Sequence, residues 1–67
     1  MIQAVIFDKS KYTIPEAIAY LRHHKLKPIK QPHTTEHYIR FRINIPHFDN
    51  YITKDAKEDG IKYVIGY

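Results

Sequence analysis

Residues 38–45 read YIRFRINI, and apolar and polar side chains alternate along the whole stretch. Successive side chains of a β-strand point to opposite faces of the sheet, so this alternation predicts a strand with one buried and one solvated face. The expected buried face holds Ile39, Phe41, Ile43 and Ile45, and the other face holds Tyr38, Arg40, Arg42 and Asn44. Pro46 is expected to end the strand, because proline has no N–H to donate to a ladder.

Two further strands are expected near the ends of the sequence. Residues 2–7 form an apolar run that only Gln3 interrupts. Its length and its β-branched residues predict a strand that is covered on both faces or central in its sheet. Polar residues 8–11 then predict a turn. Residues 61–67 predict a last strand, with Ile61, Tyr63, Ile65 and Tyr67 on one face.

A helix is expected to begin at the segment Thr13-Ile14-Pro15-Glu16, which fits a capping box. In that motif the Thr13 side chain accepts from the backbone N–H of residue 16, and Glu16 reaches back to the N–H of Thr13. An apolar stripe at helical spacing follows, formed by Ile14, Ala17, Ile18 and Leu21. Basic residues 22–25 and then Pro28 predict that the helix ends after about three turns.

The remaining segments give weaker signals. Residues 27–33 contain two prolines and are compatible with a short edge strand, and residues 34–36 predict a turn. Residues 47–60 are mostly polar and acidic, and they predict either a long loop or a short hairpin arm. The resulting order, β-α-β-β-β, predicts one α+β domain over residues 1–67. A mainly antiparallel sheet would carry one amphipathic helix packed on one face.

The whole chain has a net charge of +4, and its positive charge is concentrated in one third of the sequence. Residues 22–42 hold six basic residues and one acidic residue. Extended basic faces with aromatic side chains can track phosphates and stack bases. The candidate nucleic-acid-binding residues are therefore Arg40, Arg42, Lys27, Lys30 and Tyr38. The alternative is an ordinary solvated sheet face, on which basic side chains discourage edge-to-edge aggregation.

The sequence offers no motif for catalysis or for metal binding. The absence of cysteine excludes disulfides, thiolate nucleophiles and cysteine-based zinc sites. A Thr-Thr turn separates His33 from His37, and the acidic segment 55–60 does not fit a calcium loop. Ser10 is not part of a nucleophile elbow. We therefore expect no catalytic residue, no metal and no cofactor, and a chain that is not an enzyme.

Four segments together carry a resemblance to a known group of proteins. They are the opening strand 2–7, the helix with Thr13, Ala17, Tyr20 and Leu21, the basic strand 38–42 and the closing segment 60–66. Their order resembles a small module found in short proteins of large double-stranded DNA viruses. It is also similar to a segment of tailed-phage head-morphogenesis proteins. The resemblance spans nearly the whole chain and implies a viral origin, but it brings no catalytic or binding residue with it.

Two functions follow as expectations. The first is a small viral accessory protein that binds nucleic acid non-specifically through a basic sheet face. The alternative is a structural or protein-interaction module, such as a minor virion component, that binds a viral or host protein. A homodimer is compatible with either function. The lack of cysteine, of a basic leader and of a run of roughly 20 apolar residues predicts a protein of the host-cell interior or the virion, neither secreted nor membrane-inserted.

Overall fold

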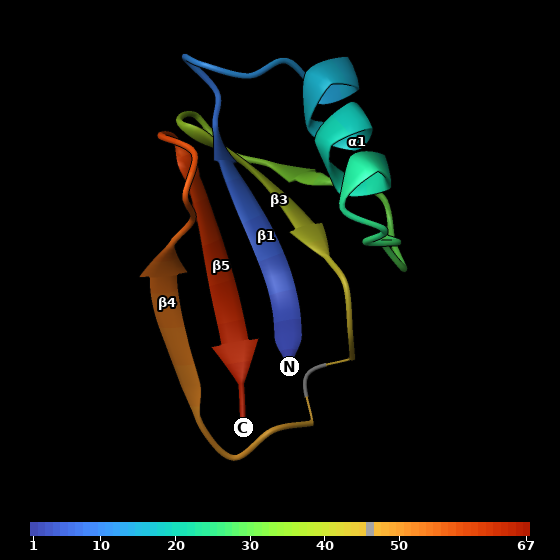
Figure 1. The fold of residues 1–67 in the computed structure, drawn as a ribbon, viewed down its shortest axis with the longest axis vertical. Helices are drawn as coiled ribbons and strands as arrows, with labels where there is room; N and C mark the ends of the chain where they lie inside the picture. Colours follow the sequence, from blue (N-terminus) through green and yellow to red (C-terminus); the bar gives the residue numbers. More distant parts are fainter. Residues whose placement is uncertain (46) are drawn as a thin grey trace.

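The computed structural model describes residues 1–45 and 47–67, and among these residues it contains five strands and one helix (Figure 1). In chain order the elements are β1 (Ile2–Asp8), α1 (Ile14–His23), β2 (His33–Thr34), β3 (Tyr38–Arg42), β4 (Tyr51–Asp55) and β5 (Ile61–Gly66). The strands form one antiparallel sheet in the order β2-β3-β1-β5-β4. This arrangement confirms the expected α+β fold and the central position of the first strand.

The helix begins at the predicted capping box. Thr13 Oγ1 accepts from the N–H of Glu16 at 3.3 Å, and Glu16 Oε1 accepts from the N–H of Thr13 at 3.0 Å. The hydrogen bonds from Thr13 lower the pKa of the Glu16 carboxyl, which stays charged at the positive end of the helix dipole. α1 ends at His23, and Lys25 then takes a positive φ of 58° that turns the chain back toward the sheet edge.

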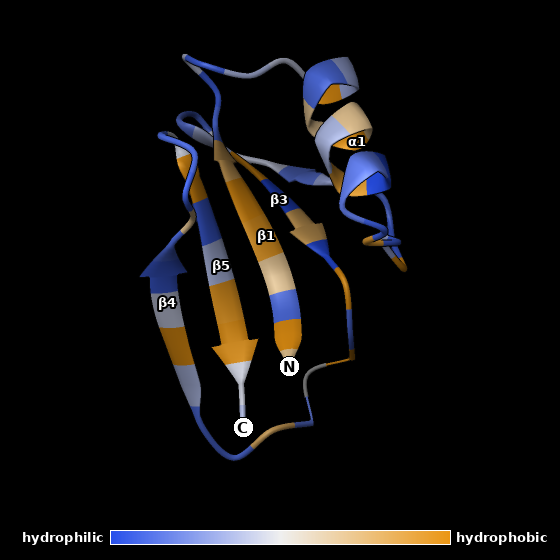
Figure 2. Ribbon diagram, viewed as in Figure 1, coloured by the Kyte–Doolittle hydropathy of each residue, from blue (hydrophilic) through white to orange (hydrophobic). Residues whose placement is uncertain are grey.

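The hydrophobic core lies between α1 and one face of the sheet. Its buried members are Val5, Phe7, Ala17, Leu21, Ile39, Phe41 and Ile61. Figure 2 shows the matching bands of apolar residues on β1, β3 and β5. Within the described residues, no helix combines the length and the apolar character that crossing a membrane requires.

The apolar stripe of the helix is narrower than its sequence predicts. Ala17 and Leu21 are buried, but Ile14 and Ile18 remain 40% and 39% exposed. The cause is Tyr20, whose ring packs against Phe7 with the centroids 5.5 Å apart. The inward face of α1 therefore runs through residues 17, 20 and 21, and the two isoleucines lie at its margin.

The strand expected over residues 38–45 ends earlier, at Arg42. The N–H groups of Ile43 and Asn44 both donate to the carbonyl oxygen of Gln3, at 2.8 and 3.2 Å, so the ladder loses its regular alternation there. Ile45 is 67% exposed and does not belong to the core, contrary to the prediction. Pro46, which was expected to end the strand, lies outside the described residues.

The two edge strands, β2 and β4, lie in the segments with the weakest sequence signals. β2 has only two residues, and it includes Thr34, so the turn begins one residue later than predicted. Thr35 Oγ1 holds that turn by accepting from the N–H of Tyr38 at 3.1 Å. Of the two alternatives for residues 47–60, the hairpin arm is observed, because β4 pairs with β5. Tyr67, expected to continue the last strand on the face that holds Ile61, lies beyond the end of β5 and is 63% exposed.

Loss of the helix cap should be measurable. We expect Thr13→Ala to lower the free energy of unfolding by about 1 kcal/mol, because the N–H of residue 16 loses its acceptor. Thr13→Ser keeps a hydroxyl at the same position and should retain most of the stability. Urea denaturation followed by circular dichroism measures both variants. An Ala variant as stable as the parent would show that the cap contributes nothing.

The register of β3 makes opposite predictions for neighbouring residues. Phe41 is 1% exposed, and Phe41→Ala should cost about 3–5 kcal/mol through lost burial and a cavity. A domain at the lower end of the usual range of about 5–15 kcal/mol would then be close to unfolded. Arg40 lies on the other face and donates only one long hydrogen bond, to Gln3, so Arg40→Gln should lower the free energy of unfolding by no more than about 1 kcal/mol. If thermal unfolding shows that the Arg40 variant is destabilised more than the Phe41 variant, the register of β3 is wrong.

Candidate nucleic-acid interface

The face of the sheet opposite α1 carries no covering layer among the described elements, and we call it the open face. The strand pairings align one residue from each strand in a row across this face. In order from β2 to β4, the row is His33, Arg40, Ile6, Lys62 and Asp55. Side chains that are far apart in the sequence thereby become neighbours.

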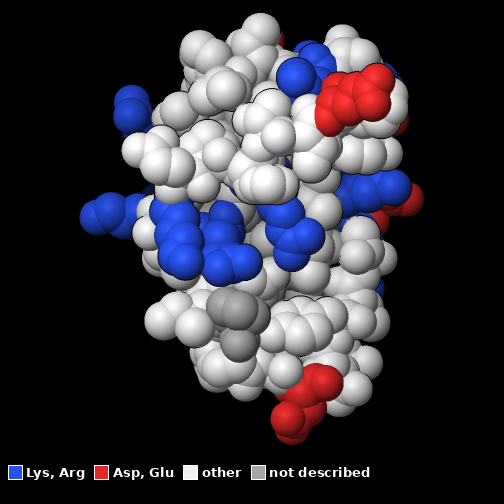
Figure 3. All heavy atoms as spheres, turned by 180° about the vertical axis from the view of Figure 1, so that it is seen from behind, with Lys and Arg blue, Asp and Glu red and all other residues white. Residues whose placement is uncertain are grey.

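Lysine and arginine side chains form a band across the middle of the molecule when it is viewed from behind (Figure 3). Acidic side chains visible on this side lie toward its upper and lower parts and at the right-hand end of the band. Arg40 and Arg42 contribute to this positive charge from β3, and Lys62 contributes from β5. The charge pattern is therefore not spread evenly over the surface.

Two adjoining hollows on the open face contain these cations. The first has a volume of about 520 Å³ and is lined by Lys30, Gln31, His33, Arg40 and Arg42. The second has a volume of about 480 Å³ and is lined by Ile6, His33, Thr35, Tyr38, Arg40, Thr53 and Lys62. His33 and Arg40 line both hollows, so the two hollows adjoin, and together we call them the basic groove.

The cations of the basic groove have no anionic partner in the described part of the chain. Both ion pairs found there lie elsewhere, between Lys11 and Asp59 and between His37 and Glu36. Lys30, Arg40, Arg42 and Lys62 thus remain available to an external anion.

One buried polar side chain supports the groove from below. Gln3 is 2% exposed, and its Oε1 accepts a hydrogen bond from the Arg40 guanidinium at 3.4 Å. Its Nε2 donates to the carbonyl oxygen of Asn44 at 3.2 Å. The amide of Gln3 is therefore satisfied at both ends and links Arg40 to the chain that leaves β3.

The structure brings together four of the five residues that the sequence suggested. Arg40, Arg42, Lys30 and Tyr38 all line the basic groove. Lys27 instead lines a separate hollow at the end of α1, so we leave it out of the interface. Sequence reasoning missed Lys62, which alternates with buried Ile61 and therefore could have been assigned to the solvated face of the last strand. Its position near Arg40 depends on β1 lying between β3 and β5.

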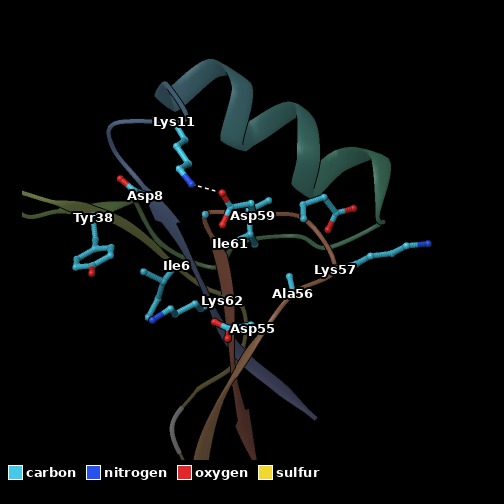
Figure 4. A pocket seen from close by; sticks show the side chains of 12 residues that line it. Ile6, Asp8, Lys11, Tyr38, Asp55, Ala56, Lys57, Asp59, Ile61 and Lys62 are labelled. Atoms are coloured by element: carbon cyan, nitrogen blue, oxygen red, sulfur yellow. Dashed lines mark hydrogen bonds and ion pairs between the residues drawn. The ribbon is translucent and has the colours of Figure 1, made fainter.

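A hollow of mixed charge adjoins the groove, with four carboxylates and three lysines in its lining. It has a volume of about 440 Å³, and its lining includes Asp8, Asp55, Glu58 and Asp59 as well as Ile6, Tyr38 and Lys62 (Figure 4). Lys11 forms an ion pair with Asp59, which lowers the pKa of the Asp59 carboxyl and raises the pKa of Lys11. Hydrogen bonds from Ser10 lower the pKa of Asp8. Tyr38 therefore stands between a cationic side and an ionised acidic side.

Other polar clusters have structural roles. Tyr20 shares a hydrogen bond with Tyr63 and donates to Glu58 at 3.1 Å, between the helix and the β5 end of the sheet. Burial and these hydrogen bonds raise the pKa of the Tyr20 hydroxyl, which stays protonated at physiological pH. In residues 1–45 and 47–67, no group of three or more histidine or acidic side chains is arranged to hold a metal ion.

Comparison with known protein families, with curated proteins and with solved structures finds no match to this chain. Its function is therefore argued from the groove itself. The chemistry that the groove offers is the binding of an extended anion by unpaired cations beside an exposed aromatic ring.

Proposed function

We propose that this chain is a small accessory protein, of the viral kind that its sequence resembles, and that it binds nucleic acid through the basic groove. The observation that carries the proposal is the pair of adjoining hollows in which Lys30, Arg40, Arg42 and Lys62 lie without an ion-pair partner among the described residues. A cluster of cations that are not held in internal ion pairs is suited to a polymer of negative charges.

The kinds of side chain in the groove support backbone recognition. A guanidinium presents a planar fork of N–H donors that matches phosphate oxygens, and two of the four cations are arginines. Phosphate contacts position a protein on nucleic acid but carry no sequence information. We therefore expect binding that depends little on base sequence and strongly on salt concentration.

The second candidate function is that of a protein-interaction module, and a different surface favours it. A hollow of about 540 Å³ at the end of α1 is lined by Ile18, Leu21, Leu26 and Pro28, with Arg22, Lys25 and Lys27 among the same lining residues. Apolar side chains with a basic rim suit an acidic amphipathic segment of another protein. We rank this function second, because three cations line this hollow against four in the whole basic groove, and because it lies apart from the open face.

Salt dependence tests the proposed function. With four phosphate contacts on duplex DNA, the slope of log affinity against log salt should be about −3 to −4. Replacing Arg40 and Arg42 together by Gln should bring it to about half that value, since each lost contact removes about 0.9 from the slope. Fluorescence anisotropy of a labelled DNA at several salt concentrations measures the slope, and circular dichroism verifies folding.

A matched control changes the same number of charges on the other surface. Arg22→Gln with Lys25→Gln removes two cations from the end of α1 and should leave the slope nearly unchanged. Absence of binding at low salt would rule out the proposed function. If both double variants lose the same amount of this slope, net charge rather than the groove attracts the DNA.

A further inference from the structure

Tyr38 gives the basic groove a feature that phosphate binding does not need. Tyr38 is 45% exposed, so a ligand can reach its side chain. The residue lines the second hollow of the groove and also the hollow of mixed charge beside it. Half-buried Ile6 lines the same two hollows and contributes apolar surface next to the ring. In Figure 4 the Tyr38 ring projects from its strand on the same side as Ile6. An aromatic ring beside an apolar floor is a platform on which a flat apolar group can stack.

The surroundings of this platform differ in charge from one side to the other. Along β3, Arg40 and Arg42 follow Tyr38 on the same face of the strand. Across to β1, Tyr38 is paired with Asp8, and at the far edge Asp55 is paired with Lys62. A phosphate backbone is thus attracted more strongly to the side of the ring with Arg40 and Arg42 than to the side with Asp8.

The spacing of the strands limits how wide a ligand the groove can hold. Arg40 and Lys62 lie on either side of Ile6 in the same row, two strand spacings apart. Neighbouring strands are about 4.8 Å apart, so the backbones of these two residues are separated by about 10 Å. The cations therefore border a narrow strip with an apolar centre.

We infer that the basic groove takes single-stranded nucleic acid, with one base stacked on Tyr38 beside Ile6 and the adjacent phosphates against Arg40, Arg42, Lys30 and Lys62. This inference rests on the proposed function and specifies the form of its ligand. A single strand has unpaired bases whose flat faces can leave the stack and meet an aromatic side chain.

A duplex fits the same surface less well. Its bases are already paired and stacked, so Tyr38 and Ile6 would gain no partner. Its second phosphate strand would also approach the surface across a groove of roughly 6 or 12 Å, and the carboxylates of Asp8 and Asp55 lie on the far side of the platform. Repulsion there would offset part of the attraction to the arginines.

The experiment compares one labelled oligonucleotide of about 12 nucleotides, within the usual site size, with the duplex of the same sequence. Anisotropy titrations at one low salt concentration use the parent and three variants. Tyr38→Ala should weaken single-strand binding by roughly 5- to 150-fold, the usual loss for one stacked base. Tyr38→Phe keeps the ring and should bind nearly as the parent does. Tyr67→Ala removes an exposed tyrosine that lines neither part of the groove, and it serves as the matched control.

The results separate this inference from the proposed function. The inference is supported if the parent binds the single strand more tightly than the duplex and if, among the three variants, only Tyr38→Ala loses affinity for the single strand. The affinity for the duplex should change little in that variant. Duplex binding as tight as single-strand binding, or single-strand binding that Tyr38→Ala leaves intact, overturns it. The proposed function would still stand in that case if the Arg40 and Arg42 double variant lost affinity. Absence of binding to either oligonucleotide overturns both.

Discussion

The edge-to-face packing around Phe7 holds the structure together. This side chain is fully buried, and its ring meets those of Tyr12, Tyr20 and Phe41 at centroid distances of 5.5–5.7 Å. Such pairs contribute about 0.5–1.5 kcal/mol each beyond the area that they bury. The three partners come from the loop before α1, from α1 and from β3, and Phe7 pairs with Ile61 of β5 in the sheet. One ring therefore fixes the helix on one face of the sheet and leaves the other face to the cations.

Features that depend on near neighbours in the chain could be predicted from the sequence. The cap at Thr13 and the burial of Phe41 are of this kind, because a capping box and an alternating strand are local patterns. β4 could not be assigned firmly, since it is paired on one side only and all its residues are exposed. The exposure of Ile18 depends on how Tyr20 packs, and the place of Lys62 in the groove depends on strand order. Both features are determined by tertiary packing, which cannot be predicted from a short stretch of sequence.

The open face combines binding groups with a packed floor. Ala4 and Val64 are buried on that face, with relative exposures of 0% and 8%. In the register Arg42 stands next to Ala4, and Thr53 stands next to Val64. The aliphatic stem of an arginine can cover apolar surface while its charged head remains in water. Arg42 therefore suits both the stability of a sheet that carries one helix and the retention of a charge for a ligand.

The pairing of β1 with β5 joins segments from almost opposite parts of the sequence, as between Ile2 and Ile65. Contacts of such long sequence separation make folding slow, because loop-closure entropy is lost before the contacts form. During synthesis, one edge of β1 must stay unpaired until residues 61–66 have been made, and making the residues between the two strands takes on the order of ten seconds. The nascent chain exposes an apolar strand edge throughout that time, so its yield in a cell should depend on chaperones and temperature more than the folded domain's own stability would suggest.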